Sequence, residues 1–498
     1  MNSFKRKALA AAVFAGLGSG AAFAGHIDPA GNGQYLIYPY YTVQQTGGNS
    51  YNTIVSVVNT TTAGKAVKVR FREGKNSREV LDFNLFLSPN DVWVGVVVPA
   101  DGTTTSPAHL LAPDNSCTNP PIPAAGVDFR NFAMISAEDF VADKSLARTR
   151  EGYLEMIEMA QVVNGPNDSL DAITHDSSGV PSDCSAVQGT APTIDLSFPT
   201  GGLTGTGTII NVNNGSDMGY KPVAIANFAA AGLPVTLSSE SANATDADPW
   251  SVTTWATADG NILVADRFYL SDWFTAVNPG VDAISAMMMS QSITNEFVLD
   301  AATKSATDWV ITFPTKRYYY ASATPWAART PFTAAGTTAG ACETIGFTYF
   351  NREENGAAPI DADFSPPPPS GPSSTLCWEA NVLSLRTDSS SGDSLVLGSR
   401  NVRDLAITNG AQNGWGRLTF TGTNAVNVGL ASDATSETGN WSVPSQAAGV
   451  QRYYGLPVVG FMVRTFNNGT LTCAGASCQG NYAAAFGHNY ERRITPQP

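Results

Sequence analysis

The stretch that most constrains the fold is residues 51–98, where apolar and polar residues alternate more regularly than elsewhere in the chain. Successive side chains of a β-strand point to opposite faces, so an alternating segment collects its apolar residues on one face. In residues 67–72 the valines and Phe71 share one face and the basic residues the other. The alternation returns in residues 80–87 and 92–98. We therefore predict three neighbouring strands of one antiparallel sheet.

The first two of these strands also have a predictable register. A turn over residues 74–78 joins them, and antiparallel partners must present the same face. This requirement sets Phe71 opposite Leu81 and Arg70 opposite Asp82. We expect the apolar face to be the core and the basic face to be solvated, with docking of an acidic neighbour as the alternative.

Composition extends this prediction to the whole chain. Charged residues make up only 14%, while glycine (46) and proline (30) are abundant. Such a composition is typical of β-proteins with long loops. We predict an all-β, mainly antiparallel fold with two immunoglobulin-like β-sandwich domains, residues 25–235 and 236–498, and long disulfide-held loops. Helical spacing of apolar residues predicts one helix at 281–299 in the second domain.

The N-terminus carries an export signal. Basic residues at 5–7 precede an apolar run and a small-residue motif ending at Ala24, so residues 1–24 read as a cleaved signal peptide. We predict an exported protein, extracellular or at the cell surface, with the periplasm as second choice, and no transmembrane segment. The formal charge of −14 argues against nucleic acid as a partner.

Six cysteines in an exported chain favour disulfides, because that compartment is oxidising. Fifteen connectivities are open. We favour neighbours in sequence, and a metal site is disfavoured because no CxxC or nearby histidine gives a ligand spacing. The expected pairs are Cys117 with Cys184, Cys342 with Cys377, and Cys473 with Cys478.

Two patterns raise the question of catalysis. Glu151, Glu155 and Glu158 lie in a segment that favours a strand, and paired carboxylates can serve glycoside hydrolysis. A solvated acidic face is the preferred interpretation. Residues 392–395 spell GDSL, an esterase nucleophile motif, but the base that would activate Ser394 is missing from the expected Asp-x-x-His position before His488. We therefore expect an exposed, inert loop and no catalytic residues, although an enzyme stays open.

Three further patterns have a binding and a structural interpretation. The tyrosines of residues 35–41 can stack on sugars, but aromatic strand residues more often fill a core. Oxygen-rich residues 213–217 leave calcium open, although the EF-hand spacing is absent and a plain turn is favoured. The methionines at 287–289 are interpreted as core rather than copper ligands. No cofactor is predicted.

Four stretches resemble a known group of proteins. They are YNTIVSVVNTT, KAVKVRFREGKNSREVLDFNLFLSPNDVW, ATDWVITFPTKR and FNREENGAAPIDADFSPPPPSG. They are similar to segments of uncharacterised exported proteins of Proteobacteria, some of them labelled as cell-surface proteins. The resemblance covers most of the mature chain and implies location, but it supplies no site residues.

Two classes of function fit these patterns. The first is a non-catalytic exported cell-surface or extracellular-matrix structural protein of the surface-layer, adhesive or filament type, partnered by itself or by cell-surface components. The alternative is an exported protein that binds or hydrolyses carbohydrate.

Overall fold

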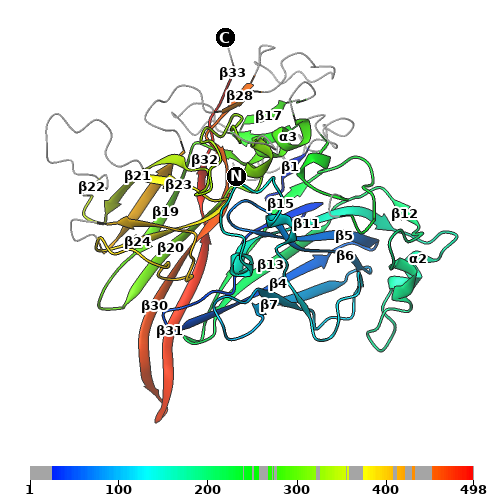
Figure 1. Ribbon diagram of the computed structural model, residues 1–498, viewed down its shortest axis with the longest axis horizontal. Helices are drawn as coiled ribbons and strands as arrows, with labels where there is room; N and C mark the ends of the chain where they lie inside the picture. The colour runs from blue at the N-terminus through cyan, green and yellow to red at the C-terminus, as the bar shows by residue number, and fades with distance from the viewer. Residues whose placement is uncertain are drawn as a thin grey trace, which may run out of the picture.

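The computed structural model describes residues 25–238, 241–248, 252–256, 267–271, 273, 278–320, 326–354, 356–357, 374–407, 412–420, 429–431 and 451–496. The signal segment and most of the loops at 364–374 and 424–445 lie outside these residues. Within them the chain is mostly antiparallel β-structure, as predicted (Figure 1). Among the described helices, none is long and apolar enough to cross a membrane.

Two sheets dominate the first half of the chain. Sheet 1 runs β1-β15-β2-β11-β5-β6-β9, with β12 beside β11, and sheet 2 runs β10-β8-β7-β4-β13-β14, with β3 beside β4. The strands of sheet 1 are β1 (His26–Ile27), β2 (Tyr35–Thr42), β5 (Gly64–Glu73), β6 (Glu79–Leu87), β9 (Cys117–Asn119), β11 (Glu151–Val162), β12 (Leu196–Ser197) and β15 (Val223–Ala226). Those of sheet 2 are β3 (Gln45–Thr46), β4 (Asn49–Asn59), β7 (Val92–Pro99), β8 (Ala108–Leu111), β10 (Val127–Asp128), β13 (Leu203–Asn211) and β14 (Ser216–Tyr220).

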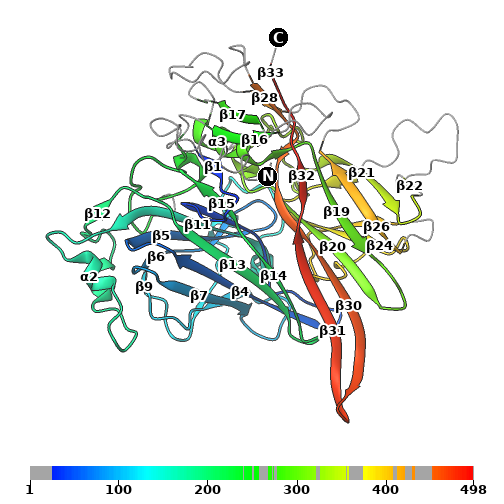
Figure 2. The same cartoon turned by 180° about the vertical axis from the view of Figure 1, so that it is seen from behind.

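Two more sheets form the second half (Figures 1 and 2). Sheet 3 runs β22-β21-β26-β19-β32, with β23 beside β21, and sheet 4 runs β25-β24-β20-β30-β31. Sheet 3 comprises β19 (Ser292–Val298), β21 (Glu343–Asn351), β22 (Gly356–Ala357), β23 (Ser374–Leu376), β26 (Asn413–Thr419) and β32 (Asn489–Glu491). Sheet 4 comprises β20 (Ser305–Thr312), β24 (Ala380–Arg386), β25 (Val402–Ala406), β30 (Val459–Cys473) and β31 (Ala476–Gly487).

Short elements complete the described fold. Three small sheets pair β16 (Val252–Ala256) with β17 (Arg267–Ser271), β18 (Met289–Ser290) with β29 (Leu456–Pro457), and β28 (Gln451–Tyr454) with β27 (Gly429–Ala431) and β33 (Ile494–Pro496). The α-helices are α2 (Ser169–Ile173) and α3 (Pro279–Met288). The 3-10 turns are η2 (Phe132–Met134), η3 (Leu146–Arg150), η4 (Cys184–Val187), η5 (Ala244–Asp246) and η6 (Lys316–Tyr319).

The predicted register of the central hairpin is confirmed. Strand β5 pairs with β6 so that Phe71 faces Leu81 and Arg70 faces Asp82. The prediction of a third strand in the same sheet is wrong, because β7 pairs with β4 and β8 in sheet 2. The turn after β6 carries the chain across to the facing sheet. The alternation of apolar and polar residues in β7 would be the same in either sheet, so the pattern cannot show which sheet β7 joins.

The solvated basic face is a second correction. The side chains of Lys68, Arg70 and Arg72 are buried, with at most 1% of their surface exposed. Later segments of the chain cover this face, and the Arg70 guanidinium donates to the Ala242 carbonyl at 2.7 Å. Alternation separates two faces of a strand, but it does not tell whether a distant segment covers the polar one.

Carboxylates from the neighbouring strands neutralise these cations. Arg72 pairs with Glu155 of β11, and Arg70 with Glu79 of β6 at 2.6 Å. Lys65 of β5 lies 2.7 Å from Glu158 of β11. The carboxylates that face these cations belong to the protein's own sheet, and docking of a separate acidic partner stays untested.

The predicted helix at 281–299 is shorter than expected. Helix α3 ends at Met288, and the chain then continues as β18 and β19. Ser292 to Val298 reads SITNEFV, and its β-branched residues favour the extended pairing with β26 that the structure shows. The helical spacing of apolar residues in α3 happens to continue into the residues of β18 and β19, beyond the end of the helix.

The two large apolar cores of the described chain combine residues from its two halves. The core between sheets 1 and 2, which contains Phe71 and Trp93, also includes Val310 and Phe461 of sheet 4. On the opposite face of sheet 1, a second core joins Tyr35 and Ile157 of that sheet to α3 and to sheets 3 and 4. All eight residues of β2 are consequently buried.

Two of the expected disulfides are present, Cys117–Cys184 and Cys342–Cys377. The backbone at the tip of the β30–β31 hairpin is described, but the side chains of Cys473 and Cys478 lie outside the described set. The third pair therefore stays a prediction.

Replacing Arg72 by methionine should destabilise the protein by about 3–5 kcal/mol, because it leaves the Glu155 carboxylate buried without its cation. Adding Glu155→Gln should recover part of this loss, so that the double variant is less destabilised than the sum of the singles. Urea unfolding measures these differences. Arg352→Met, at an exposed pair with Glu353, is the control and should leave the midpoint unchanged. Strictly additive effects at Arg72 and Glu155 would contradict the pairing.

The oxidised mature protein should contain three disulfides and no free thiol. Alkylation without reduction, followed by mass spectrometry, should find no modified cysteine, and non-reducing digestion should link Cys473 to Cys478. Alkylation of two or more cysteines would refute this expectation.

Candidate functional site

The turn at residues 74–78, between β5 and β6, is held by a single carboxylate. Glu73 accepts hydrogen bonds from the backbone N–H groups of Lys75 (2.7 Å), Asn76 (2.9 Å) and Arg78 (2.9 Å). Arg148 donates two more, from Nε (2.6 Å) and from a terminal nitrogen (2.7 Å). Five donors on one buried side chain fix the conformation of the whole turn.

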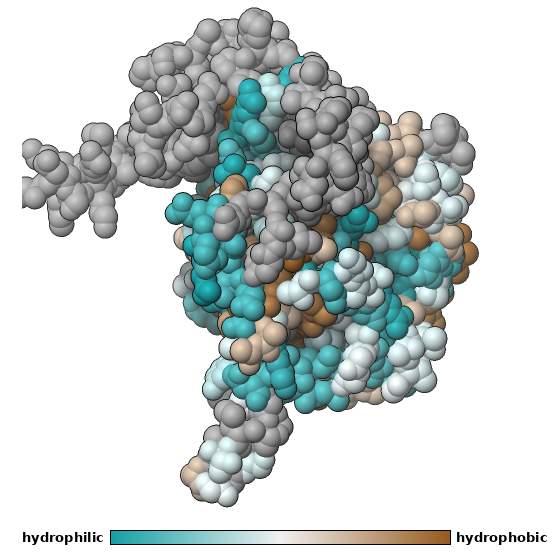
Figure 3. All heavy atoms as spheres, turned by 90° about the vertical axis from the view of Figure 1, so that its left-hand side faces the viewer, coloured by the Kyte–Doolittle hydropathy of each residue, from teal (hydrophilic) through white to brown (hydrophobic). Residues whose placement is uncertain are grey.

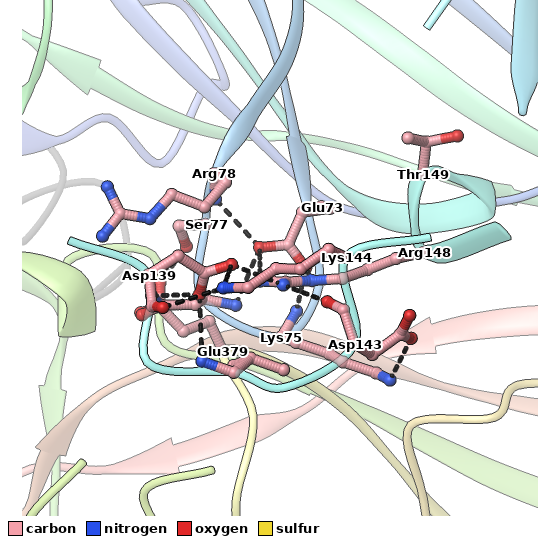
Figure 4. A network of polar contacts seen from close by, with 12 residues as sticks. Glu73, Lys75, Ser77, Arg78, Asp139, Asp143, Lys144, Arg148, Thr149 and Glu379 are labelled. Carbon is pink, nitrogen blue, oxygen red and sulfur yellow. Dashed lines mark hydrogen bonds and ion pairs between the residues drawn. The ribbon is translucent and has the colours of Figure 1, made fainter. Parts of the chain in front are cut away.

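A second carboxylate extends this network (Figure 4). Asp139 lies 2.6 Å from Arg148 and accepts a hydrogen bond from the Asn76 side chain at 3.0 Å. Lys144 approaches the same carboxylate at 3.0 Å. These contacts attach the segment that follows η2 to the turn at 74–78. The Arg78 guanidinium points away from the network.

The fixed turn docks onto the second half of the chain. The Gly74 carbonyl accepts hydrogen bonds from the backbone N–H groups of Glu379 (3.0 Å) and Ala380 (2.8 Å), and the Ser77 hydroxyl donates to the Glu379 carboxyl. A Cβ at Gly74 would lie 2.5 Å from the Asn401 side-chain amide, so a larger residue here would displace that side chain.

Glu379 and Lys316 are buried behind the turn. Burial raises the pKa of Glu379 to about 8, because the nearby cations only partly offset desolvation. Its Oε1 has no hydrogen-bond partner among the described residues. Burial lowers the pKa of Lys316 to about 8, and its Nζ donates to the Ala341 carbonyl at 2.7 Å. The protonated form of Glu379 is favoured at neutral pH.

A pocket of about 230 Å³ opens beside the turn, at the junction of the two halves. We call it the junction pocket. The first half contributes Arg78, Glu138 and Phe140, and the second half contributes Arg317, Tyr320 and Trp326. The Phe140 ring lies 5.5 Å from that of Tyr320 and 5.8 Å from that of Trp326, so the aromatic wall is continuous.

The charges of the pocket are mainly positive. Burial lowers the pKa of Arg78, and the neighbouring Arg317 guanidinium lowers it further. Arg317 donates to the Ser77 carbonyl at 3.2 Å. Glu138, 3.3 Å from Arg78, is the carboxylate that faces this pair, and its side chain is 62% exposed at the rim. The pocket therefore presents two guanidinium groups and an aromatic wall.

Such a surface is suited to binding rather than to proton transfer or nucleophilic attack. Guanidinium groups provide paired donors for an anion, and aromatic rings provide flat apolar contact. The described lining contains one carboxylate and no histidine or cysteine.

The three glutamates raised by the sequence are not a catalytic pair. Glu155 and Glu158 are buried and paired with Arg72 and Lys65, so the expected solvated acidic face is wrong. Glu151 accepts from the Ser399 hydroxyl at 2.6 Å, and its other partners are the Tyr40 hydroxyl, the Gln44 amide and backbone N–H groups at 400–401. Each of these carboxylates has a structural role within or between sheets.

The GDSL motif at residues 392–395 has both exposed and buried residues. Leu395 is exposed as expected, but Ser394 is only 5% exposed, which corrects the expectation of a fully exposed loop. Its hydroxyl accepts from the Ser399 N–H at 2.9 Å and hydrogen-bonds Asp308. His488 is held elsewhere, between Asn295 and the Val310 carbonyl, and burial lowers its pKa to about 4.

The remaining candidates are structural. Tyr35, Tyr38, Tyr40 and Tyr41 are at most 1% exposed, which confirms their interpretation as core. The turn expected at 213–217 lies at 212–215, between β13 and β14, and residues 216 and 217 already belong to β14. Met287, Met288 and Met289 lie in the apolar core. Within the described part of the chain, no three His, Cys, Asp or Glu side chains gather as a metal site.

Sequence reasoning did not find the junction pocket. Its residues come from two separate stretches of the first half, at 76–78 and 138–140, and from residues 317–326 of the second half, and neither helical nor strand periodicity links them. The one available signal was the run KRYYY (316–320), in which two basic residues precede three tyrosines. Its first two residues end the ATDWVITFPTKR stretch.

Comparisons with family models, with curated proteins and with solved structures found no match for this chain.

The buried carboxyl of Glu379 should make stability depend on pH. The folded state keeps its proton up to about pH 8, whereas the unfolded state releases it near pH 4.5, so stability should fall as pH rises through this window. In Glu379→Gln this component should vanish, and the difference between pH 5 and pH 8 should shrink by roughly a few kcal/mol, at about 1.4 kcal/mol per pKa unit. Urea unfolding at several pH values measures it.

Glu296→Gln, at an exposed side chain, is the matched control and should retain the wild-type profile. Identical pH profiles for the wild type and Glu379→Gln would show that this carboxyl is ionised in both states.

Proposed function

We propose that the protein is a non-catalytic structural component of the cell surface or extracellular matrix, of the surface-layer, adhesive or filament type. It is exported, with the periplasm as the second choice of location, and its partners are further copies of itself or other surface components. The proposal includes an immunoglobulin-like arrangement of its facing sheets. Two disulfides in the described chain support it, since such bonds persist in oxidising compartments.

The observation that carries the proposal is an arm formed by the β30–β31 hairpin. At its base, β30 pairs with β20, and the Asn481 amide of β31 donates to the Asn214 carbonyl at 2.9 Å. Beyond the pair Asn467–Asn481 the hairpin projects from the body as a narrow extension (Figures 1, 2 and 3). A projecting hairpin of this kind offers a surface for contacts with another molecule.

Strand β31 is also the last strand of sheet 4, and because β14 of sheet 2 packs beside it near the body, its edge is open only in part. An edge strand presents backbone donors and acceptors that a strand from another molecule can pair with. Tyr482 and Phe486 of β31 are 62% and 41% exposed, so this edge also offers apolar contact area. These features favour self-association along the arm.

Carbohydrate binding is the second candidate function. The aromatic wall of the junction pocket is the observation that favours it. Hydrolysis of glycans has less support, because the glutamates considered for it are engaged in ion pairs and hydrogen bonds inside the fold.

The arm can be tested by shortening it. Deleting residues 468–480 and joining the strands with an Asn-Gly turn should abolish self-association without lowering the melting temperature, because the shared cores are untouched. Purified mature protein should form oligomers or ordered arrays in electron microscopy and light scattering, measured with and without Ca²⁺. Cys473→Ser with Cys478→Ser keeps the arm length and should still assemble. A monomeric wild type, or unchanged assembly of the shortened variant, would contradict the proposal.

A further inference from the structure

The junction pocket contains buried polar atoms that the described chain leaves without a hydrogen-bond partner. They are Nε of Arg78, the Tyr320 hydroxyl and Nε1 of Trp326. Leaving a buried polar group without a hydrogen bond is unfavourable, and native proteins have few such groups. These atoms are themselves enclosed, but they show that the lining has more donors than acceptors, so the pocket favours a ligand that carries acceptors.

The charges of the lining indicate that the ligand is an anion. Arg78 and Arg317 lie close enough for one to lower the pKa of the other, while Glu138 faces them from the rim. The whole chain carries a formal charge of −14, so a cluster of guanidinium groups is a local exception. Guanidinium groups favour the planar, bidentate geometry of a carboxylate.

The aromatic wall and the size of the pocket limit the rest of the ligand. Phe140, Tyr320 and Trp326 provide flat apolar contact with a polar N–H and O–H at the edge, which suits a sugar ring with one apolar face. A volume of about 230 Å³ is below the range of about 300–1,000 Å³ for drug-sized ligands. The space therefore fits one ring rather than a chain.

We propose that the junction pocket binds a single acidic sugar unit, of the uronic acid type, at the end of a glycan or free in solution. Its carboxylate lies against Arg78 and Arg317, its apolar face stacks on Trp326 and Tyr320, and its hydroxyls donate to Glu138 at the rim. The inference rests on the second candidate function, carbohydrate binding, and is independent of self-association.

Contacts within the protein hold several lining residues of the pocket in place. Glu73 and Arg148 fix the turn that carries Arg78, and the Cys342–Cys377 disulfide flanks Ala341 and Trp378, which pack against the aromatic cluster. A preformed site loses little conformational entropy on binding. The pocket is therefore suited to a small ligand with few contacts.

Calorimetric titration of the mature protein with four probes tests this inference. Sodium glucuronate should bind, whereas glucose, which lacks the carboxylate, and acetate, which lacks the ring, should bind about tenfold more weakly or not at all. Benzoate combines a carboxylate with an aromatic ring and should bind more weakly than glucuronate, because it cannot satisfy the hydroxyl contacts. Quenching of tryptophan fluorescence gives an independent readout.

Two variants assign the binding to this pocket. Arg78→Met and Trp326→Leu should each weaken glucuronate binding by about tenfold or more. Arg464→Met, at an arginine that also lies over an aromatic ring but outside the pocket, should bind as the wild type does. Thermal melting of each variant separates loss of the site from loss of the fold.

Each other outcome would overturn the inference in a distinct way. Equal affinity for glucose and glucuronate would leave carbohydrate binding intact and reject the acidic ligand. Tighter binding of benzoate would reject the sugar. No binding of either sugar at millimolar concentration would reject both the inference and the second candidate function. Unchanged binding by both pocket variants would place the ligand elsewhere.

Discussion

The carboxylate of Glu73 is the contact on which the junction of the two halves depends. It gathers three backbone N–H groups of the turn at 74–78 and a bidentate arginine, so a five-residue turn at the end of a hairpin becomes a rigid element. That rigidity lets the Gly74 carbonyl meet two backbone donors of the second half and brings Ser77 to Glu379. The junction pocket exists because this turn forms one of its walls.

Charge burial is the second feature that organises the molecule. Sheet 1 has ionisable side chains on a covered face, and basic side chains of β5 face carboxyl groups of β6 and β11. Desolvation makes such pairs of little net benefit to stability, but losing one partner is costly because the other stays buried. The pairs therefore specify which strands may be neighbours, since any other alignment would leave a charge without its counter-ion.

The sequence predicted the local pairing of strands and cysteines well. It did not predict which faces of the sheets are covered by segments distant in the chain. The register of Phe71 with Leu81 followed from alternation alone, and two disulfides followed from proximity in sequence. The burial of Arg70 and Arg72 did not follow, because residues that cover them, Ala242 and Tyr318, lie far along the chain. The same limit hid the junction pocket. Helix α3 was predicted too long because apolar spacing alone does not mark where a helix gives way to a strand.

These features describe one molecule in which the halves share their cores and meet at a fixed turn. A rigid body with a projecting arm suits a structural role at the cell surface, and a small basic pocket at the junction suits recognition of an acidic sugar. The central claim is that the two halves form one cooperative unit. Hydrogen exchange measured by mass spectrometry at increasing urea tests it most directly. Peptides from β5 and from β20 should lose protection together, at one urea concentration, whereas loss of protection in one half while the other stays protected would show that the halves are independent domains.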